Sequence, residues 1–529
     1  MTNVSFKDTQ AMDVILAALP PLMVLILMVG WRCGGSKAGA VGWILALLIA
    51  TLLFGAGIDV QAYAHLRALI LTVDVVFIVW AALLLYLVVD QAGALQVIAD
   101  WLTALTGDDV LRVLLLGWVF TSFLQGVGGF GVPVAIAAPL LVGLGLPPLA
   151  AVVIPSIGHA WAVTFGSLGS SYITLTGVTG LDGYYLAPET AFILGIMAIA
   201  CGVMAAFAYA GWRGLQRGLP AIVIIGATMA MVQYLAATNG LWNIASALSG
   251  LAGLIIGLGV TRLPFYHASS SPSTSTQQPE TPRPSFLLAI SGYIILVILA
   301  VFIKGVEPVK QIFSSFELSI DVPQVITSKG WITEADTIGF SLLGHTGAIL
   351  LYSALIASFL FDRRGYYPPN TRQKIITGVR KKGIPPAIGI LTMMCMAIIM
   401  ANSGMTREIA QWMSRAVPAD LYALVATTIG ALGAFMTGSN TNSNAVFAVL
   451  QMDTAILMSL SVPTVLAIQT TAGAIASLLA PAKIMVGAST VGLSGDEGRV
   501  LRALFIYGGG LLCLIALIGF VMLQIHASA

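Results

Sequence analysis

The sequence is poor in charged residues. Only 9% of its 529 residues are Asp, Glu, Lys or Arg, whereas about a quarter of the residues of a soluble globular domain are charged. Its mean hydropathy is +0.96. These values exclude an ordinary soluble protein and indicate an integral membrane protein. The net charge of +2 comes from basic residues gathered in loops, so we expect no nucleic-acid partner.

The sequence also lacks the motifs of several enzyme classes. No His is followed by Glu, no Ser stands three residues before a Lys, and no Gly directly precedes a Lys. These absences exclude an H-E-x-x-H zinc site, a Ser-x-x-Lys dyad and a P-loop. The four cysteines stand singly in or beside apolar runs, which indicates neither a disulfide framework nor a metal site. We therefore expect neither an enzyme nor an ATP-driven pump, and no cofactor. The cysteines are Cys33, Cys201, Cys395 and Cys513.

Long apolar runs recur along the whole chain. A helix of about 20 residues crosses a bilayer core of about 30 Å, and the runs do not alternate as the strands of a barrel would. The first run is not followed by a small-residue cleavage site, so we expect a retained span and not a signal peptide. We predict an all-α polytopic membrane protein with about twelve transmembrane helices, at residues 13–29, 38–58, 66–90, 149–178, 188–210, 219–236, 240–260, 285–304, 336–361, 384–401, 463–493 and 499–525.

The basic residues predict the orientation of these helices. Positive clusters near Arg32, Arg213, Arg262, Arg363 and Arg499 all fall on the cytoplasmic side if both termini are extracytoplasmic. This arrangement requires two further apolar stretches, 110–146 and 421–461, to enter the membrane and return on the same side as re-entrant hairpins. It also places the loop 305–335 outside and the Pro/Ser/Thr-rich linker 263–285 in the cytoplasm.

The two hairpins belong to an internal repeat. Ile98-Ala-Asp-Trp101 precedes the first and Ile409-Ala-Gln-Trp412 the second, and Gly93 and Gly404 keep the same spacing. A span with an interrupted middle follows each hairpin, at 149–178 and 463–493. The charge pattern makes the two units inverted repeats. The predicted organisation is N-terminal helices 1–65, first repeat 66–217, connecting helices 218–262, linker 263–285, connecting helices 286–383 and second repeat 384–529.

Each hairpin carries a polar or glycine-rich break in its middle. The second break, Gly438 to Asn444, has seven consecutive small or amide polar residues. Non-helical backbone at membrane depth is tolerated where protein or water surrounds it, typically where broken segments meet at a binding site. Small polar residues can also serve helix packing alone, but two such breaks at matching repeat positions favour a site. The candidate substrate-binding residues of the breaks are Gln125, Gly128, Gly129, Phe130, Gly131, Ser439, Asn440, Thr441, Asn442, Ser443 and Asn444.

At these breaks the chain resembles the lactate permease family. The matching segments are FLQGVGGFGVPVAIAAPLLVGLGLPPLAA (123–151), FGSLGSS (165–171), FMTGSNTNSNAVFAVLQ (435–451) and TTAGAIASLLAPAKIMVGASTVGLSG (470–495). The resemblance implies transport of lactate, glycolate or a related 2-hydroxymonocarboxylate, usually with protons. It also implies a transport domain that slides past a scaffold in an elevator-type mechanism, within a homodimer in a bacterial inner membrane.

The chain departs from the family pattern at four positions. The pattern has acidic residues where this chain has Gln125 and Asn440, an Asn at His159 and a Lys at Ser477. His159 and Lys483 are therefore new polar candidates for binding an anionic substrate through a positive charge. Alternatively, His159 is a buried histidine bonded to a backbone carbonyl, and Lys483 is a lysine whose side chain reaches the membrane interface.

The sequence is compatible with either H⁺ or Na⁺ as the coupling ion. His159 and Asp74 are the candidates for proton coupling, since each is an ionisable group within a span. His345 is more often a structural residue. Neutral oxygens of Ser439, Asn440, Thr441 and Asn442 form a candidate Na⁺ site. We expect a symporter for a small organic anion driven by H⁺, with Na⁺ as the alternative ion. An anion channel, or a transporter subunit for a sulfonate or dicarboxylate, is the alternative function.

Overall fold

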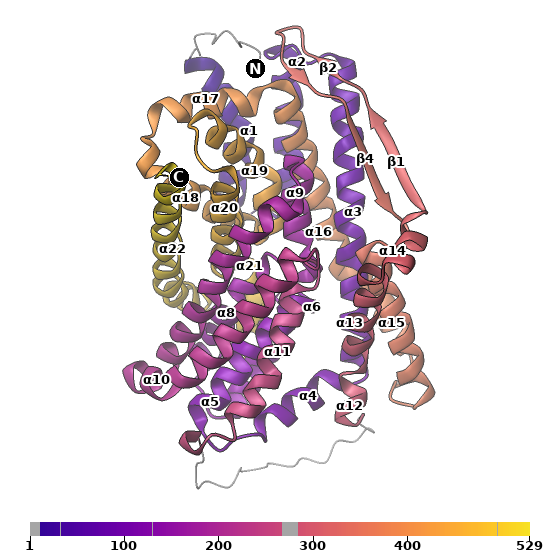
Figure 1. The fold of residues 1–529 in the computed structure, drawn as a ribbon, viewed down its shortest axis with the longest axis vertical. Coiled ribbons are helices and arrows are strands. Elements are labelled where there is room, and N and C mark those ends of the chain that lie inside the picture. Colours follow the sequence, from indigo (N-terminus) through magenta and orange to yellow (C-terminus); the bar gives the residue numbers. More distant parts are fainter. Residues whose placement is uncertain (1–10, 32, 130, 267–283, 495, 529) are drawn as a thin grey trace.

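The computed structural model (Figure 1) describes residues 11–31, 33–129, 131–266, 284–494 and 496–528. Phe130 and most of the linker 263–285 lie outside the described residues. The helices are α1 (Ala11–Val29), α2 (Gly35–Leu52), α3 (Ile58–Gln91), α4 (Ala94–Thr103), α5 (Asp109–Leu114), α6 (Thr121–Val127), α7 (Val132–Gly143), α8 (Pro148–Ala160), α9 (Ser170–Thr179), α10 (Gly183–Thr238), α11 (Ala245–Val260), α12 (Phe286–Ala289), α13 (Ser291–Gly305), α14 (Glu307–Ser314), α15 (Thr346–Arg363), α16 (Thr371–Ser403), α17 (Met405–Ala416), α18 (Tyr422–Thr437), α19 (Asn440–Leu457), α20 (Val462–Ala476), α21 (Pro481–Thr490) and α22 (Glu497–Ser528).

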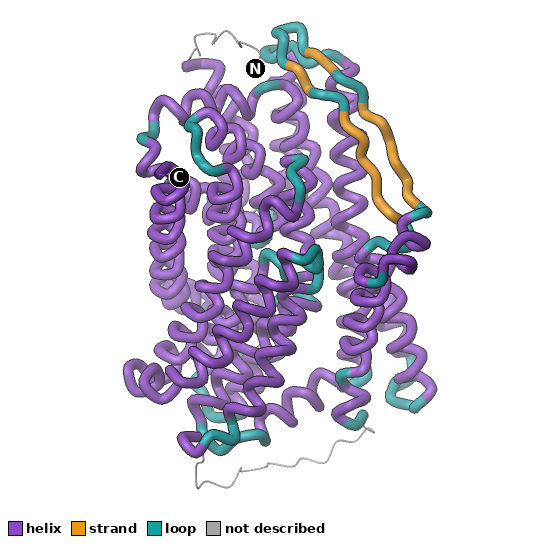
Figure 2. Tube along the Cα trace, viewed as in Figure 1, coloured by secondary structure: helices purple, strands orange, loops and turns teal. Residues whose placement is uncertain are grey.

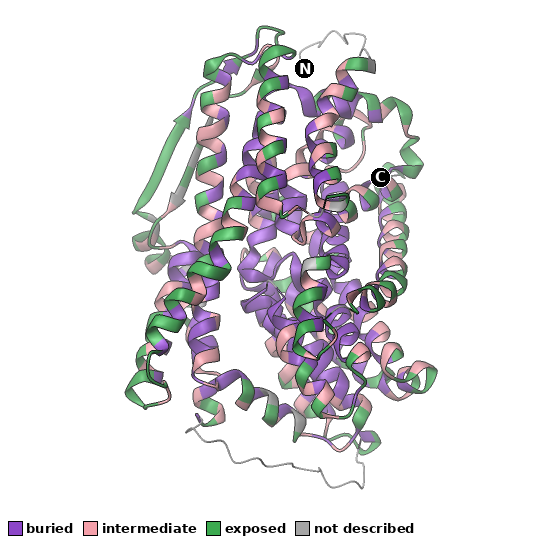
Figure 3. Cartoon of the chain, turned by 180° about the vertical axis from the view of Figure 1, so that it is seen from behind, coloured by how far each residue is buried: buried purple, intermediate pink, exposed green. Residues whose placement is uncertain are grey.

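The helices pack into two groups. In one, α3 and α16 lie side by side, with α2 along α16 and α15 along α3. In the other, α18, α19 and α20 pack against one another, and α10 packs on α8, α11 and α20. Buried residues concentrate in the interior of the bundle, as Figure 3 shows. Apolar side chains such as Ile506 and Leu517 remain exposed on α22, as expected for a surface that faces lipid.

Ten described helices are long and apolar enough to cross a membrane, whereas the sequence predicts about twelve crossings. Two of the ten, Asp109–Val127 and Ala419–Thr437, are first arms of the predicted hairpins. The predicted spans at 13–29, 240–260 and 285–304 correspond to shorter apolar helices. The prediction of a multi-pass helical membrane protein is confirmed. The predicted number of about twelve spans is not confirmed.

Helix α10 contains two of the predicted spans. Its backbone leaves the helical region at Ala210 and Gly211. On either side of this turn the helix folds back on itself, since a Cβ at Gly195 would lie 3.1 Å from Ala230 and one at Gly226 would lie 2.9 Å from Ile199. The predicted separation of 188–210 from 219–236 agrees with this turn.

The predicted all-α class describes the membrane-spanning fold, and one segment between the helices forms short strands that the sequence analysis did not predict. Strands β1 (Glu317–Val322) and β4 (Asp336–Ser341) pair antiparallel, with Glu317 opposite Ser341, and β2 (Val325–Ile326) pairs antiparallel with β3 (Ile332–Thr333). Figure 2 shows these strands along one edge of the helical body. The predicted span 336–361 therefore begins with a strand, because the polar residues Asp336 and Thr337 satisfy their backbone in a hairpin. Its helix begins at Thr346.

The same series of elements occurs twice in the chain. A long helix (α3, α16) ends at a glycine in the left-handed region, Gly93 with φ 68° and Gly404 with φ 87°. A short helix (α4, α17), two helices joined at a break, and an interrupted helix follow in both halves. Figure 2 shows non-helical segments at mid-height of the bundle. The order agrees with the predicted repeat, whose inverted orientation in the membrane stays a prediction.

Candidate functional site

The tip of the second hairpin is a tight turn between α18 and α19. Gly438 ends α18 with φ 69°, a conformation that glycine adopts without steric cost. Ser439 then caps α19, its Oγ accepting a hydrogen bond of 3.3 Å from the backbone N–H of Asn442. Thr437 Oγ1 donates to Ser439 O at 3.0 Å. The polar run therefore forms the capped N-terminus of α19, and most of its side chains are buried in protein.

This tip contacts the interrupted helix of the first half. Thr441 Oγ1 and Ser171 Oγ lie 3.0 Å apart. Asn440 Nδ2 donates to Thr164 Oγ1 at 3.1 Å, and Asn444 Nδ2 donates to Ser171 O at 2.9 Å. Thr164 lies between the short helical turn Trp161–Val163 and the turn Ser167–Gly169, where the backbone of the first interrupted helix leaves the α-helical path. The second hairpin thus completes the break of the first half.

The two interrupted helices also contact each other. Thr164 Oγ1 donates to Thr470 O at 3.2 Å and lies 3.3 Å from Thr470 Oγ1. Thr470 Oγ1 in turn accepts from Asn440 at 3.2 Å and from Asn444 at 2.8 Å. Thr164 and Thr470 are the centre of this cluster, but the sequence analysis did not select them. Their position inside the interrupted spans 149–178 and 463–493 is the signal that could have found them.

The first hairpin lies against the same break. Its arms are α5, a π-helical stretch (Leu115–Phe120) and α6 on one side and α7 on the other. A Cβ at Gly129 would lie 1.8 Å from Ser167 Oγ, and one at Gly166 would lie 3.0 Å from Gln125 Nε2. Gly131 faces Val486 of α21. The predicted residues Gln125, Gly129 and Gly131 therefore meet both interrupted helices, while Phe130 lies outside the described residues.

His159 ends α8 at the start of the first break. Its Nδ1 lies 2.6 Å from Pro155 O. Because a carbonyl oxygen only accepts, Nδ1 carries the hydrogen and Nε2 is the lone-pair nitrogen of the neutral ring. Nε2 is buried and has no hydrogen-bond partner among the described residues. The ring is thus both bonded to a carbonyl and equipped with a free nitrogen.

Lys483 lies just after the second break, where α20 gives way to the short turn Ser477–Leu479 and α21 begins at Pro481. Its Nζ donates to Ser477 Oγ at 2.9 Å, so the ammonium turns back toward the end of α20. Lys483 and His159 thus stand at corresponding breaks, one in each half.

Several oxygens around the breaks are buried without a partner in the described part of the chain. They are Gln125 Oε1, Asn440 Oδ1, Asn442 Oδ1, Asn444 Oδ1 and Thr471 Oγ1. A buried polar atom without a partner costs about 1–3 kcal/mol, and native proteins hold few of them. Asn440 and Asn444 face Thr470, whereas Asn442 lies on another face of α19, beside Pro21 and Met393. No three His, Cys, Asp or Glu side chains cluster as a metal site within the described ranges.

Ser443 faces away from the break. Its Oγ donates to Gly430 O at 2.9 Å and accepts from Gln469 Nε2 at 3.2 Å. Gln469 Oε1 in turn accepts from Gln451 Nε2 at 3.1 Å. These bonds hold the two arms of the second hairpin to α20. The N–H of Gly128 donates to Leu124 O at 2.8 Å, as part of the end of α6.

Asp74 lies outside the tip cluster. It belongs to α3 and pairs with His345 Nε2, the residue before α15. His345 Nδ1 accepts from the N–H of Gly347 at 3.1 Å, and its ring stacks on Phe77 with centroids 5.1 Å apart. The partner of Asp74 could not be predicted, because 271 residues separate the two in the chain.

Comparison with known proteins agrees with this architecture. Residues 13–526 match the family described as L-lactate permease. The chain belongs to the lactate permease family. This permease is 27% identical to the glycolate permease GlcA of Escherichia coli, over 93% of this chain and 92% of that protein. It is 27% identical to an L-lactate permease of Salmonella typhimurium, over 92% of each chain, and 26% identical to one of Bacillus subtilis, over 97% and 96%.

One solved structure is also similar to the permease. The YdaH transporter of Alcanivorax borkumensis, described as having an unusual topology, aligns with a TM-score of 0.48 and 16% identity over 85% of each chain. Family membership makes this protein a multi-pass membrane transporter and not an enzyme, as the sequence predicts.

Proposed function

We propose that this permease is a symporter for a small 2-hydroxymonocarboxylate such as lactate or glycolate, with H⁺ as the coupling ion. The relatives are named for these two anions. A 2-hydroxy acid offers one carboxylate and one hydroxyl close together. The substrate therefore needs a cationic partner for the first group and an acceptor for the second.

The observation that supports the proposal is the position of His159 and Lys483 at corresponding breaks, one in each half. The Lys483 ammonium supplies positive charge beside the breaks, and its bond to Ser477 uses one of the three donors of an ammonium group. The carboxylate lies between Lys483 and His159 Nε2. The unpartnered amide oxygens of Asn440 and Asn444 are acceptors for the substrate hydroxyl. Helix N-termini at Ser439 and Pro481 add favourable partial charge.

The free nitrogen of His159 explains proton coupling. Protonation at Nε2 produces an imidazolium, which attracts the carboxylate more strongly than the neutral ring does. Anion and proton then stabilise each other's binding, because the coupling between two ligands is reciprocal. A buried anion beside an imidazolium also avoids the cost of an uncompensated charge.

One observation favours Na⁺ as a second candidate ion. The amide oxygens of Asn440, Asn442 and Asn444 are neutral oxygen ligands that have no partner within the described ranges, and Ser439 and Thr441 lie in the same turn. Hard cations take oxygen ligands of this kind. In this alternative the tip binds Na⁺, and Lys483 alone holds the anion.

We also propose an elevator-type transport movement, which the packing supports. The hairpins and interrupted helices are linked by side-chain hydrogen bonds across both halves, so they move as one body against the group formed by α2, α3, α15 and α16. This is an elevator-type movement within a homodimer in the bacterial inner membrane, with both termini extracytoplasmic and both hairpins re-entrant.

Uptake by the purified protein in proteoliposomes tests the proposal. Inward pH and Na⁺ gradients are imposed separately on vesicles, and uptake of labelled L-lactate and glycolate is measured. Saturable uptake driven by the pH gradient is expected, with competition by 2-hydroxy acids. Non-saturable flux that follows the anion gradient alone would identify a channel. Competition only by sulfonates or dicarboxylates would identify a different substrate class.

A further inference from the structure

A second candidate site lies far from the breaks, at the base of the first hairpin. A cavity of about 440 Å³ opens between the start of α5, the loop that joins α7 to α8, and the end of the first half of α10. This volume is within the range of about 300–1,000 Å³ that is typical of small-ligand pockets. Its lining residues are Asp109, Arg112, Val113, Leu144, Gly145, Leu146, Pro147, Leu149, Ala150, Ala208 and Tyr209.

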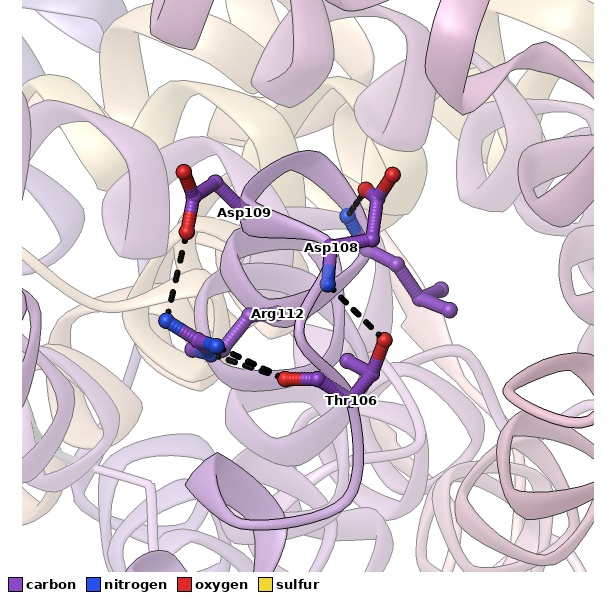
Figure 4. A network of polar contacts seen from close by, with 5 residues as sticks. Thr106, Asp108, Asp109 and Arg112 are labelled. Atoms are coloured by element: carbon purple, nitrogen blue, oxygen red, sulfur yellow. Dashed lines mark hydrogen bonds and ion pairs between the residues drawn. The ribbon is translucent and has the colours of Figure 1, made fainter. Parts of the chain in front are cut away.

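The polar wall of this cavity is held by several hydrogen bonds. Arg112 donates to Thr106 O through Nε at 3.2 Å and through one terminal nitrogen at 2.7 Å, and its other terminal nitrogen donates to Asp109 Oδ1 at 3.2 Å. Figure 4 shows the guanidinium between Thr106 and Asp109. These bonds use three of the five N–H donors of an arginine. Two donors remain for an anion, held in the planar geometry that suits phosphate oxygens.

Asp108, next to this polar wall, forms an ion pair with Arg217 of α10. Asp108 caps α5, accepting from the N–H of Leu111 at 2.9 Å, and its other oxygen accepts from Arg217 Nε at 2.7 Å. The Arg217 guanidinium also lies 4.2 Å from the ring centroid of Phe265. Tyr266 donates to Arg217 O at 3.0 Å, and burial raises the pKa of its hydroxyl, so it stays protonated. Arg217 thus compensates the negative charge of Asp108. Arg112 and Asp109 are the charged residues that line the cavity.

The remaining wall is apolar and lies at the end of the spans. Leu144, Leu146 and Leu149 line the cavity beside the charged pair. Tyr209 also lines it and stands three residues before the exposed Trp212, and such aromatic residues gather at the level of lipid headgroups. A cavity with a phosphate-binding cation, a carboxylate and an apolar wall at this level matches an amphipathic ligand with two opposite charges.

We propose that this cavity binds the headgroup of an aminophospholipid, phosphatidylethanolamine. The phosphate meets the two remaining donors of Arg112, the ammonium meets Asp109, and the upper acyl chain covers Leu144, Leu146 and Leu149. The bound lipid bridges the base of the first hairpin and the turn of α10. The site is independent of the proposed substrate.

Lipid-dependent thermal stability of the purified, delipidated protein tests this site. Phosphatidylethanolamine is expected to raise the midpoint of unfolding more than phosphatidylcholine does, because a trimethylated ammonium cannot donate to Asp109. Soluble phosphoethanolamine and inorganic phosphate are expected to give little shift, because they lack the acyl chain. An equal effect of both lipids, or an equal effect of phosphoethanolamine, would overturn the lipid assignment.

Two variants assign the effect to the cavity. Asp109→Asn, at a side chain that is 72% exposed, is expected to fold and to lower the apparent affinity for phosphatidylethanolamine roughly tenfold, as loss of a charge-assisted hydrogen bond does. Arg112→Lys keeps the charge but loses the fork and is expected to weaken binding as well. Asp496 and Arg499 form a matched control, a pair with the same spacing whose atoms are 3.4 Å apart. If Asp496→Asn weakens lipid binding as much as Asp109→Asn does, the cavity is not the site.

Discussion

Lys483 Nζ donates a hydrogen bond of 2.9 Å to Ser477 Oγ, across the break that separates α20 from α21. In a continuous helix these residues, six positions apart, would lie on different faces. The turn at Ser477–Leu479 and the start of α21 at Pro481 bring the ammonium back to the position where the family pattern has a lysine. We propose that Lys483 supplies the charge that the sequence lacks at Ser477.

Loss of this charge should weaken substrate binding. Lys483→Met is expected to raise the KM for uptake at every pH, because a hydrogen bond from a charged group contributes about 1.5–3 kcal/mol, which is roughly a 10- to 150-fold change in affinity. Initial uptake rates in proteoliposomes measure it. The double variant Ser477→Lys/Lys483→Ser should recover part of the affinity. Lys374→Met, at an exposed lysine, is the control, and equal effects of both single variants would refute the role of Lys483.

The pH dependence of uptake should depend on His159. Wild-type uptake is expected to rise as the external pH falls, because the proton is a co-substrate. His159→Gln keeps a polar side chain but cannot take up a proton, so it should give a flat pH profile while counterflow exchange continues. Asp74→Asn, in the pair with His345, should keep the wild-type profile. The reverse outcome would move the proton site to Asp74.

The tip of the second hairpin tests the alternative ion. If Na⁺ binds there, Asn442→Ala removes a buried amide oxygen that has no partner in the described part of the chain and should raise the Na⁺ concentration for half-maximal uptake. Asn239→Ala, at an exposed asparagine, should leave it unchanged. Uptake that does not respond to Na⁺ at any concentration would exclude this ion and leave the tip as a contact of the anion.

Close packing at the first break predicts that substitution of Gly129 lowers the stability of the fold. This residue has φ 67°, and a Cβ added to it would lie only 1.8 Å from Ser167 Oγ. Gly129→Ala is expected to destabilise the fold by about 1–3 kcal/mol, because the backbone conformation is strained for alanine. Gly143 has no neighbour within 4 Å of an added Cβ, so Gly143→Ala should change stability by less than about 0.5 kcal/mol. Thermal unfolding in detergent compares the two variants.

Much of the fold could be predicted because the bilayer imposes strong rules on sequence. Apolar runs of fixed length identified the helices, and the polar breaks identified both places where helices are interrupted. The strands at 317–341 were missed because short polar strands carry little periodicity. The helix at 183–238 was divided correctly, since Arg213 and Arg217 stand just after the turn at Ala210 and Gly211.

The candidate site was predictable only in part. His159, Lys483 and the asparagines of the tip stand out because polar residues are rare in this chain. The sequence does not indicate their partners, since Asn440 and Thr164 are 276 residues apart and meet only after both halves have packed. The role of Ser477 as the acceptor for Lys483 depends on the path of the backbone at Pro481, which spacing alone does not give.

The bond between Thr164 and Thr470 has a consequence for how such a protein can arise and be divided. Neither half contains a whole site, because the tip of the second hairpin finishes the break of the first half. The two halves, produced as separate polypeptides, should each be inactive and should regain uptake only when they are synthesised together. If the two halves are inverted as predicted, an ancestor with a single unit would have needed a pair of chains inserted in opposite directions.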